Sequence, residues 1–230
     1  MSSAVIFDLD GVIADTHPLH TRAWKQLLRE RGREVSDEEL SIIREGRKRE
    51  EILRQFFRNL STEEAASLGA RKEELFQMSC GAIKPMSGLP QFLSQLEGFH
   101  IPKAVATSAS KRRAFDILSR LHLIERFITV VTGDDVVQGK PNPSIFVLAA
   151  KHFVAAATDI LVIEDSTAGV RAAKSAGMKC VGLASDFWAH QLYEAGADYV
   201  ISSFSEVSWS DLCELMRCKA KTEQRIVEPN

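Results

Sequence analysis

The chain has 230 residues, of which 45% are hydrophobic and 26% charged, and its formal net charge is −2. This composition predicts an ordinary soluble protein with one large domain, or one domain carrying a smaller one, and it argues against nucleic acid as the main partner. No apolar run approaches the ~18 residues that span a bilayer, and the first residues show no secretory signal. We therefore expect a cytoplasmic protein without a membrane partner; the oligomeric state is not visible, and a monomer is favoured.

The first apolar segment runs from Ala4 to Phe7 and is typical of a strand buried on both faces of a parallel sheet. It is followed at once by Asp8 and Asp10, with Gly11 supplying a close turn. Two carboxylates at the end of a buried strand raise each other's pKa unless a cation shares the site, and Mg²⁺ prefers such oxygen ligands. From these residues alone, a strand end capped by solvated aspartates is the alternative.

Residues 16 to 85 show helical periodicity and no strand signal. The apolar stripe from Leu19 to Leu28 predicts one helix, a capping box at 36–39 opens a second, residues 52–60 form a third, and a second box at 61–64 opens a long fourth. A segment of this length is too large for a connecting loop, so we expect a small all-α bundle that forms a separate cap over residues 16–85. The turn-rich stretch 84–88 is the expected return hinge.

Beyond this hinge, strand and helix patterns alternate. Strands are expected at 104–107, 128–131, 160–163, 180–183 and 199–201, with helices at 89–96, 114–121, 142–152 and 167–176. Such alternation predicts right-handed crossovers and an α/β fold with a doubly wound parallel sheet, which binds ligands at the carboxyl ends of its strands. The predicted core comprises residues 1–15 and 86–218, and residues 219–230 form a polar tail.

Polar residues follow three of the later strands. Thr107-Ser108-Ala109-Ser110-Lys111 precedes a helix start, where unpaired N–H groups can bind phosphate, although Ser and Thr cap helices generally. Lys140 stands in Gly-Lys-Pro-Asn-Pro, either as a solvated loop lysine or as a side chain aimed by the prolines. Glu164 and Asp165 end a fully apolar strand, where two carboxylates are hard to explain as surface.

These motifs, in this order and each at a strand end, resemble those of the haloacid dehalogenase superfamily, in its small-molecule phosphatase and phosphomutase branch. The stretch from Asp8 to Thr16 is similar to the first motif of that family, DxDG[VT]xxDT. The resemblance implies a Rossmann-like core in which Asp8 is a nucleophile that becomes phosphorylated and Asp10 is a general acid/base.

The later motifs carry further implied roles. By the resemblance, Ser108 binds phosphate, with Thr107 as the alternative and Ala109 and Lys111 beside it, and Lys140 neutralises phosphate and nucleophile. The implied Mg²⁺ ligands are Asp8, Asp165 and the backbone carbonyl of Asp10, with Glu164 assisting through water.

The cap segment contains Thr16, His20 and Trp24 and then a basic stretch ending in Arg49. This content resembles the β-phosphoglucomutase-like group, which implies that Thr16, His20 and Arg49 contact the substrate. A histidine beside an apolar stripe also fits a structural role.

We therefore expect a Mg²⁺-dependent phosphatase that hydrolyses a small phosphorylated metabolite through an aspartyl-phosphate. The alternatives are a sugar phosphomutase of the β-phosphoglucomutase type and a noncatalytic metabolite-binding protein; a dehalogenase would not require the Asp165 metal site. Phosphatase is preferred over mutase because Glu45 precedes Gly46, where the resembling mutases have lysine. A carboxylate there repels a distal phosphate by ~1 kcal/mol at 4 Å in water and by more where desolvated.

Overall fold

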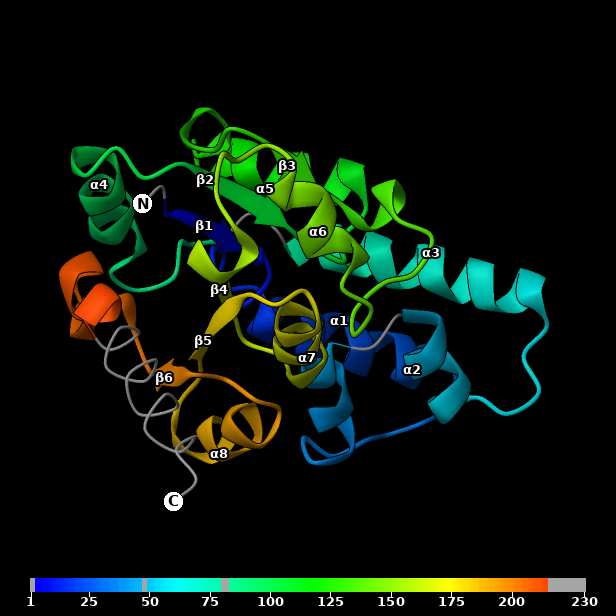
Figure 1. The fold of residues 1–230 in the computed structure, drawn as a ribbon. Helices are drawn as coiled ribbons and strands as arrows, with labels where there is room; N and C mark the ends of the chain where they lie inside the picture. The colour runs from blue at the N-terminus through cyan, green and yellow to red at the C-terminus, as the bar shows by residue number, and fades with distance from the viewer. Residues whose placement is uncertain (1–2, 47–48, 80–82, 215–230) are drawn as a thin grey trace, which may run out of the picture.

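The computed structural model describes residues 3–46, 49–79 and 83–214. Its centre is a six-stranded sheet in the order β3-β2-β1-β4-β5-β6, and all the strand pairs are parallel (Figure 1). The strands are β1 (Ala4–Phe7), β2 (Lys103–Ala106), β3 (Val130–Val131), β4 (Ile160–Glu164), β5 (Lys179–Leu183) and β6 (Tyr199–Ile201). The expected doubly wound parallel sheet is confirmed.

The third strand is shorter than predicted. Ile128 and Thr129 still exchange backbone hydrogen bonds with the neighbouring strand, at 2.9 Å to Lys103 and 3.0 Å to Val105, but only Val130 and Val131 join the ladder. At the centre, Phe7 pairs with Val105 on β2 and with Ile163 on β4. The strand order reverses at β1, so its carboxyl end and that of β4 flank the crevice where such sheets bind ligands.

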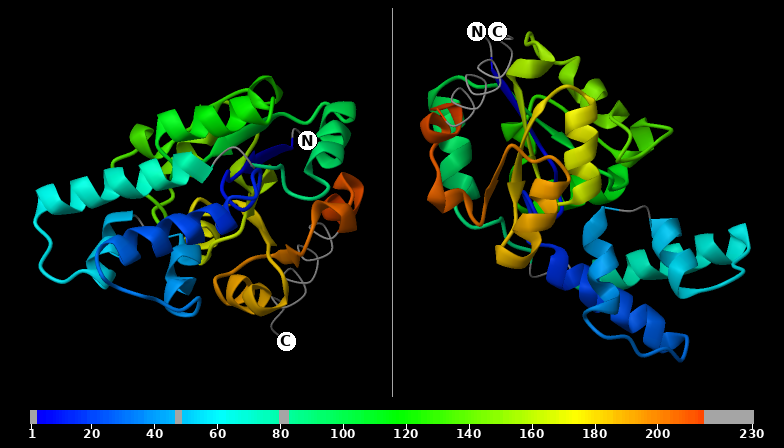
Figure 2. Two further views of the ribbon diagram at one scale, coloured as in Figure 1. Left: turned by 180° about the vertical axis from the view of Figure 1, so that it is seen from behind. Right: turned by 60° about the horizontal axis from the view of Figure 1, so that its bottom comes forward.

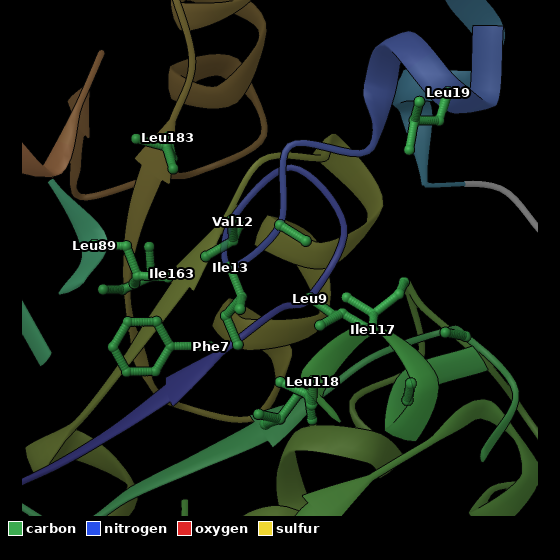
Figure 3. Packing of buried hydrophobic residues seen from close by; sticks show 14 of the residues in the cluster. Phe7, Leu9, Val12, Ile13, Leu19, Leu89, Ile117, Leu118, Ile163 and Leu183 are labelled. Atoms are coloured by element: carbon green, nitrogen blue, oxygen red, sulfur yellow. The ribbon is translucent and has the colours of Figure 1, made fainter. Parts of the chain in front are cut away.

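Successive residues of each strand point to opposite faces, and both faces are covered. One face packs on α6 (Ser144–Ala150), α7 (Thr167–Ser175) and α8 (Asp186–Glu194), and the other on α4 (Leu89–Gly98) and α5 (Lys111–Arg120). Figure 3 shows Phe7 with Leu89 and Ile163 nearby in the second of these layers. Burial on both sides explains why the strands are continuous apolar runs.

The helix predicted over residues 142–152, opened by Asn142 and Pro143, begins later than expected. The Asn142 side chain accepts a hydrogen bond from the backbone N–H of Ser144 at 3.0 Å, and α6 starts at Ser144 and ends at Ala150. The asparagine thus forms a local turn with the residue two further on, and Pro143 takes the cap position instead of the first helical one.

The helical segment between β1 and α4 lies beside the sheet layers as a group of its own (Figure 2, right panel). It contains α1 (His17–Glu30), the 3₁₀ helix η1 (Glu39–Glu45), α2 (Arg49–Phe56) and α3 (Thr62–Ser79). Both capping boxes form, with reciprocal bonds of 2.9 and 3.1 Å between Ser36 and Glu39 and between Ser61 and Glu64. The first box opens a 3₁₀ helix instead of an α-helix, and Gly46, in the left-handed region at φ +76°, follows its last residue.

The chain enters and leaves this cap through two adjacent connections. Ala14 pairs with Pro85 in an antiparallel bridge, and backbone hydrogen bonds of 2.9 Å join Asp15 to Lys84 and Met86 to Ile13. The predicted boundaries at 15/16 and 85/86 fall here and stay predictions, while the predicted tail at 219–230 lies outside the described residues. Among the described helices, none has the length and apolar character needed to cross a membrane.

Candidate active site

A cavity of about 340 Å³ opens where the cap helices meet the carboxyl ends of the strands. The structure brings eight of the predicted site residues to its wall, namely Asp8, Asp10, His20, Arg49, Thr107, Ser108, Lys140 and Asp165. The other predicted residues, Thr16, Ala109, Lys111 and Glu164, are not in this wall.

Three carboxylates meet at the switch point of the sheet. Asp8, Glu164 and Asp165 each offer an oxygen, and these atoms lie within 4.8 Å of one another. Burial, Glu164 and Asp165 raise the pKa of Asp8 well above its usual range, against the opposing charge of Lys140. This cluster of hard, mostly buried oxygen donors fits Mg²⁺, whose charge would offset the repulsion.

Lys140 reaches this cluster from the loop before α6. Its Nζ donates to Asp8 Oδ1 at 2.7 Å and to the Ala106 carbonyl at 3.2 Å, and it also pairs with Glu164 Oε1. The peptide bond between Lys140 and Pro141 is cis. Burial opposes the charge of Lys140, but the two carboxylates raise its pKa, so the lysine stays protonated beside Asp8.

Glu164 is fully buried and holds its neighbours in place. Its Oε2 accepts hydrogen bonds of 2.9 Å from the backbone N–H groups of Asp165 and Ser166 and from the Ser166 hydroxyl. Gly169 packs against it so closely that a Cβ there would lie 1.8 Å from Oε1. Both oxygens are therefore engaged, so Glu164 orients Lys140 and Asp165; its water-mediated contact with the metal stays a prediction.

Asp165 is held from the cap by His17. The His17 Nε2 lies 2.5 Å from Asp165 Oδ2, and although burial opposes the charge, this contact raises the pKa of His17. Gly11 passes close to the same oxygen at φ +74°, and a Cβ at this position would lie 2.1 Å from it. Glycine is thus required both by the left-handed backbone and by the close approach.

Asp10 lies in the turn after β1 and is surrounded by donors. Oδ1 accepts from the Thr16 hydroxyl at 2.8 Å and lies 3.3 Å from His20 Nε2, while Oδ2 accepts from Arg113 Nη2 at 2.8 Å. Burial alone raises the pKa of Asp10, but Arg113 and His20 hold it well below its usual range. The Thr16 hydroxyl thus faces Asp10, and its predicted contact with the substrate stays a prediction.

His20 connects Asp10 to a buried lysine on α3. Lys72 Nζ lies 2.6 Å from His20 Nδ1, and the His20 ring stacks on Phe76 with centroids 4.3 Å apart. Burial and Lys72 lower the pKa of His20 to about 3, and burial and Arg113 lower the pKa of Lys72 to about 7. These partners assign a neutral His20 that accepts from Lys72 at Nδ1 and donates from Nε2 toward Asp10.

The predicted phosphate-binding segment, residues 107–111, has only part of its polar groups free to bind an anion. Ser108 is exposed at the cavity wall, but the Thr107 hydroxyl accepts from the backbone N–H of Ala109 at 3.1 Å. The N–H of Lys111 donates to Asp134 at 2.8 Å, and Ser110 caps α5 through the N–H of Arg113. Ser108 is therefore the residue of this segment best placed for an anion.

The basic part of the cap lies at the far wall of the cavity. Arg49 is exposed there and loosely paired with Glu73 at 3.9 Å, and the Arg44 guanidinium lies 5.6 Å from the ring centre of Trp188 on α8. Glu45, in contrast, is not among the residues of the cavity wall. Arg47 and Lys48 lie outside the described residues.

Several site residues received no role from the sequence: His17, Lys72, Glu73 and Arg113. The sequence contains a signal that Lys72 is buried, because it lies four residues from both Leu68 and Phe76 and so shares their buried stripe on α3. Arg113 had none, since its position in a run of basic residues is typical of an exposed helix turn.

The sheet and the site together define an α/β enzyme with a buried aspartate, a lysine and an acidic pair at the switch point of its strands. A family model for haloacid dehalogenase-like hydrolases matches residues 5–183. The chain belongs to this family, in its β-phosphoglucomutase-like phosphatase group.

Three individual proteins are similar to this chain over most of its length. Over 214 residues the chain is 35% identical to Beta-phosphoglucomutase of Bacillus subtilis, covering 89% of this chain and 91% of the relative. It is 31% identical to Validoxylamine A 7'-phosphate phosphatase of Streptomyces hygroscopicus, covering 91% and 97%. The solved structure of CbbY from Rhodobacter sphaeroides with xylulose-(1,5)bisphosphate has a TM-score of 0.80 at 27% identity, covering 92% and 99%.

Proposed function

We propose that this enzyme is a Mg²⁺-dependent phosphatase that hydrolyses a small sugar phosphate through an aspartyl-phosphate on Asp8. The observation that carries the proposal is the contact of 2.7 Å between Lys140 and Asp8 inside a cluster of three carboxylates. A buried carboxylate that is paired with a cation at the end of β1 can act as the nucleophile that attacks a phosphorus atom held in the cavity. The proposal is supported by the relatives named above, which are a phosphoglucomutase, a validoxylamine A 7'-phosphate phosphatase and a protein whose structure contains xylulose-(1,5)bisphosphate.

In the first step an Asp8 oxygen bonds to phosphorus as the ester P–O bond breaks, and in the second a water oxygen attacks the same phosphorus and releases Asp8. Lys140 and Ser108 neutralise and orient the phosphoryl oxygens, which is the main work in phosphoryl transfer. Asp8, Asp165 and the Asp10 carbonyl would hold Mg²⁺, which supplies further neutralising charge when bound.

Asp10 handles the proton in both steps. In its protonated form it gives a proton to the departing ester oxygen, and the carboxylate that results takes one from the attacking water. The donors on both of its oxygens, Thr16, His20 and Arg113, stabilise the ionised form. This arrangement supports the second role most directly, because an ionised carboxylate is the form that accepts the proton of water.

A phosphomutase is the second candidate. It is favoured by the match to Beta-phosphoglucomutase over most of both chains and by Arg49 in the cavity wall, where a cation can hold a second phosphate. It is disfavoured by the acidic residue at position 45, although that residue is outside the wall itself.

The test is a screen of phosphate release from hexose 1- and 6-phosphates, pentose phosphates and nucleotides in the presence of Mg²⁺. We expect sugar phosphates to be the preferred group. When the reaction with a ³²P-labelled substrate is stopped by denaturation, the protein should carry label. Hydroxylamine should remove this label, because it cleaves acyl phosphates, and the Asp8→Asn protein should carry none. Labelling that persists in Asp8→Asn would contradict the assignment.

Metal dependence is tested separately. Chelation with EDTA should abolish turnover reversibly, and Mg²⁺ should restore it. Ca²⁺ should inhibit, because its larger and looser oxygen shell misplaces the attacking carboxylate. Full activity after exhaustive chelation would remove the metal from the mechanism.

A further inference from the structure

Arg113 joins three parts of the site. It extends from the first turn of α5 into the cavity, where its Nη2 donates to Asp10 Oδ2 at 2.8 Å. Its Nη1 lies 3.6 Å from Glu73 on the cap helix α3, and its guanidinium lies 5.6 Å from the ring centre of Phe76 on the same helix. One side chain of the core therefore contacts both a site carboxylate and the cap.

Stability alone does not account for this placement. The Arg113 side chain is only 15% exposed, and its Nε is buried with no hydrogen-bond partner in the part of the chain that the structure describes. Burying a guanidinium with an unsatisfied donor is costly, and an apolar side chain of similar volume at such a place is often neutral or stabilising. The cost indicates a role at Asp10.

We infer that Arg113 is a positioning residue for Asp10 and that Glu73 holds Arg113 in place, so that the seating of the cap helix α3 and the orientation of the Asp10 carboxylate are coupled. The inference rests on the proposed function, because it concerns the group that moves the proton there. It assigns to two residues, one from the core and one from the cap, a joint effect on the same carboxylate.

The geometry gives the reason. Asp10 lies in a turn beyond the end of β1, so its carboxylate is not fixed by the sheet ladder. Thr16 and His20 hold Oδ1, and in the described residues Arg113 is the hydrogen-bond partner of Oδ2. Without Arg113 the carboxylate is held through Oδ1 alone and can turn about its last bond, and proton transfer depends steeply on such alignment.

The experiment compares Arg113→Met, which keeps the alkyl stem over Phe76, with Arg113→Lys, Glu73→Gln and the control Arg112→Met on the exposed side of the same helix. With p-nitrophenyl phosphate and the best sugar phosphate, we expect Arg113→Met to lower kcat roughly 10- to 100-fold with KM within about threefold, a size typical of misplaced proton transfer. Arg113→Lys should have a kcat between those of Arg113→Met and the wild type. Glu73→Gln should lower kcat less than Arg113→Met does, and Arg112→Met should have the kcat of the wild type. A change confined to KM would overturn the inference.

A double-mutant cycle with Asp10→Asn separates positioning from a structural effect. p-Nitrophenyl phosphate suits this cycle, because its leaving group needs little protonation, so residual turnover stays measurable, while the attack of water on phosphorylated Asp8 still needs Asp10 as the base. If Arg113 acts through Asp10, Arg113→Met should change kcat little in the Asp10→Asn background. Equal fold losses in both backgrounds would overturn the inference while leaving the proposed function intact.

A readout without turnover completes the design. A crystal structure of Arg113→Met, with its thermal unfolding midpoint as a check on folding, should show the Asp10 carboxylate rotated from its wild-type orientation. An unchanged Asp10 would overturn the positioning role even if no substrate were found. A wild-type enzyme that releases phosphate from no monoester would instead contradict the proposed function.

Discussion

The two walls of the cavity are built on different principles. The core wall takes Asp8, Lys140 and Asp165 from short segments at the ends of strands or directly before a core helix, and these groups bond to one another or to Glu164. The cap wall takes His20 and Lys72 from the faces of two helices, and it reaches the core through contacts to Asp10 and Asp165. In the proposed mechanism the core wall carries the phosphoryl chemistry, while the cap wall aligns the proton-transfer group and surrounds the rest of the substrate.

The largest effect is expected at the centre of the core wall. Asp8→Asn nearly preserves shape and removes the nucleophilic charge, so turnover should fall on the order of 10⁴-fold or more, as for other lost nucleophiles. Lys140 keeps Glu164 as a partner, so the fold should persist. The measurement is phosphate release by the purified variant, with circular dichroism as the folding control. Retention of a tenth of the wild-type rate, with contamination excluded, would show that another group attacks.

A glycine substitution tests how tightly the core wall is packed. In Gly169→Ala the new Cβ would lie 1.8 Å from Glu164 Oε1, so Glu164 must shift and Lys140 with it. We expect about 2 kcal/mol of destabilisation from overpacking and a loss of kcat near tenfold. The control is Gly98→Ala at the end of α4, where the described residues leave open space around the new methyl group. Similar unfolding curves for both variants would contradict this packing argument.

The contrast between the walls also explains how much could be predicted. The strand pattern fixes where Asp8 and Asp165 lie, because the carboxyl ends of adjacent parallel strands meet at one edge of the sheet. The family, the sheet and the cluster of Asp8, Lys140 and Asp165 around one cavity were therefore within reach of the sequence.

The cap wall was less accessible, because it depends on how a helix face meets a distant surface. Arg113, on the core side of the contact with the cap, lies in a basic run typical of an exposed helix turn, and its cap partner Glu73 is far away in the sequence. Spacing did not show that the turn after β1 directs the Thr16 hydroxyl to Asp10, and the predicted contact of Thr16 with the substrate stays a prediction. Spacing shows which residues share a helix face, whereas the packing angle decides what that face touches.

The pH dependence of stability tests the buried lysine of the cap wall. The pKa of Lys72 is about 7 in the folded state and about 10.4 when exposed in the unfolded chain. At pH values between these two, Lys72 is protonated in the unfolded state but largely neutral in the folded state. Lys72 therefore makes the stability of the wild type rise as pH increases from 7 toward 10. Lys72→Met removes this dependence.

We therefore expect the free energy of unfolding of the wild type to rise between pH 6 and pH 9 by on the order of 2 kcal/mol more than that of Lys72→Met. The measurement is urea unfolding at several pH values, with the exposed Lys151→Met as the control. Parallel profiles for wild type and Lys72→Met would mean that Lys72 keeps an ordinary pKa in the folded state.

The smallest effect concerns the fate of the phosphoryl group. Glu45 was expected to repel a second phosphate and so to favour water as the acceptor. The structure places its neighbours Arg44 and Gly46 in the cavity wall but not Glu45 itself, so its charge acts on a distal phosphate from outside the wall. Salt screens part of an interaction that acts from outside the wall, since the Debye length is about 8 Å at physiological ionic strength.

Glu45→Lys should therefore raise the fraction of phosphate transferred to sugar by only about twofold, a shift of roughly 0.4 kcal/mol. The assay supplies β-glucose 1-phosphate with catalytic glucose 1,6-bisphosphate and follows glucose 6-phosphate and free phosphate together. Glu51→Lys, an exposed position on α2, makes the same charge change and should leave the ratio unaltered. If the wild type forms glucose 6-phosphate far faster than it releases phosphate, the phosphatase assignment is wrong, and the basic cap wall, with Arg49 in it, then outweighs the charge at position 45.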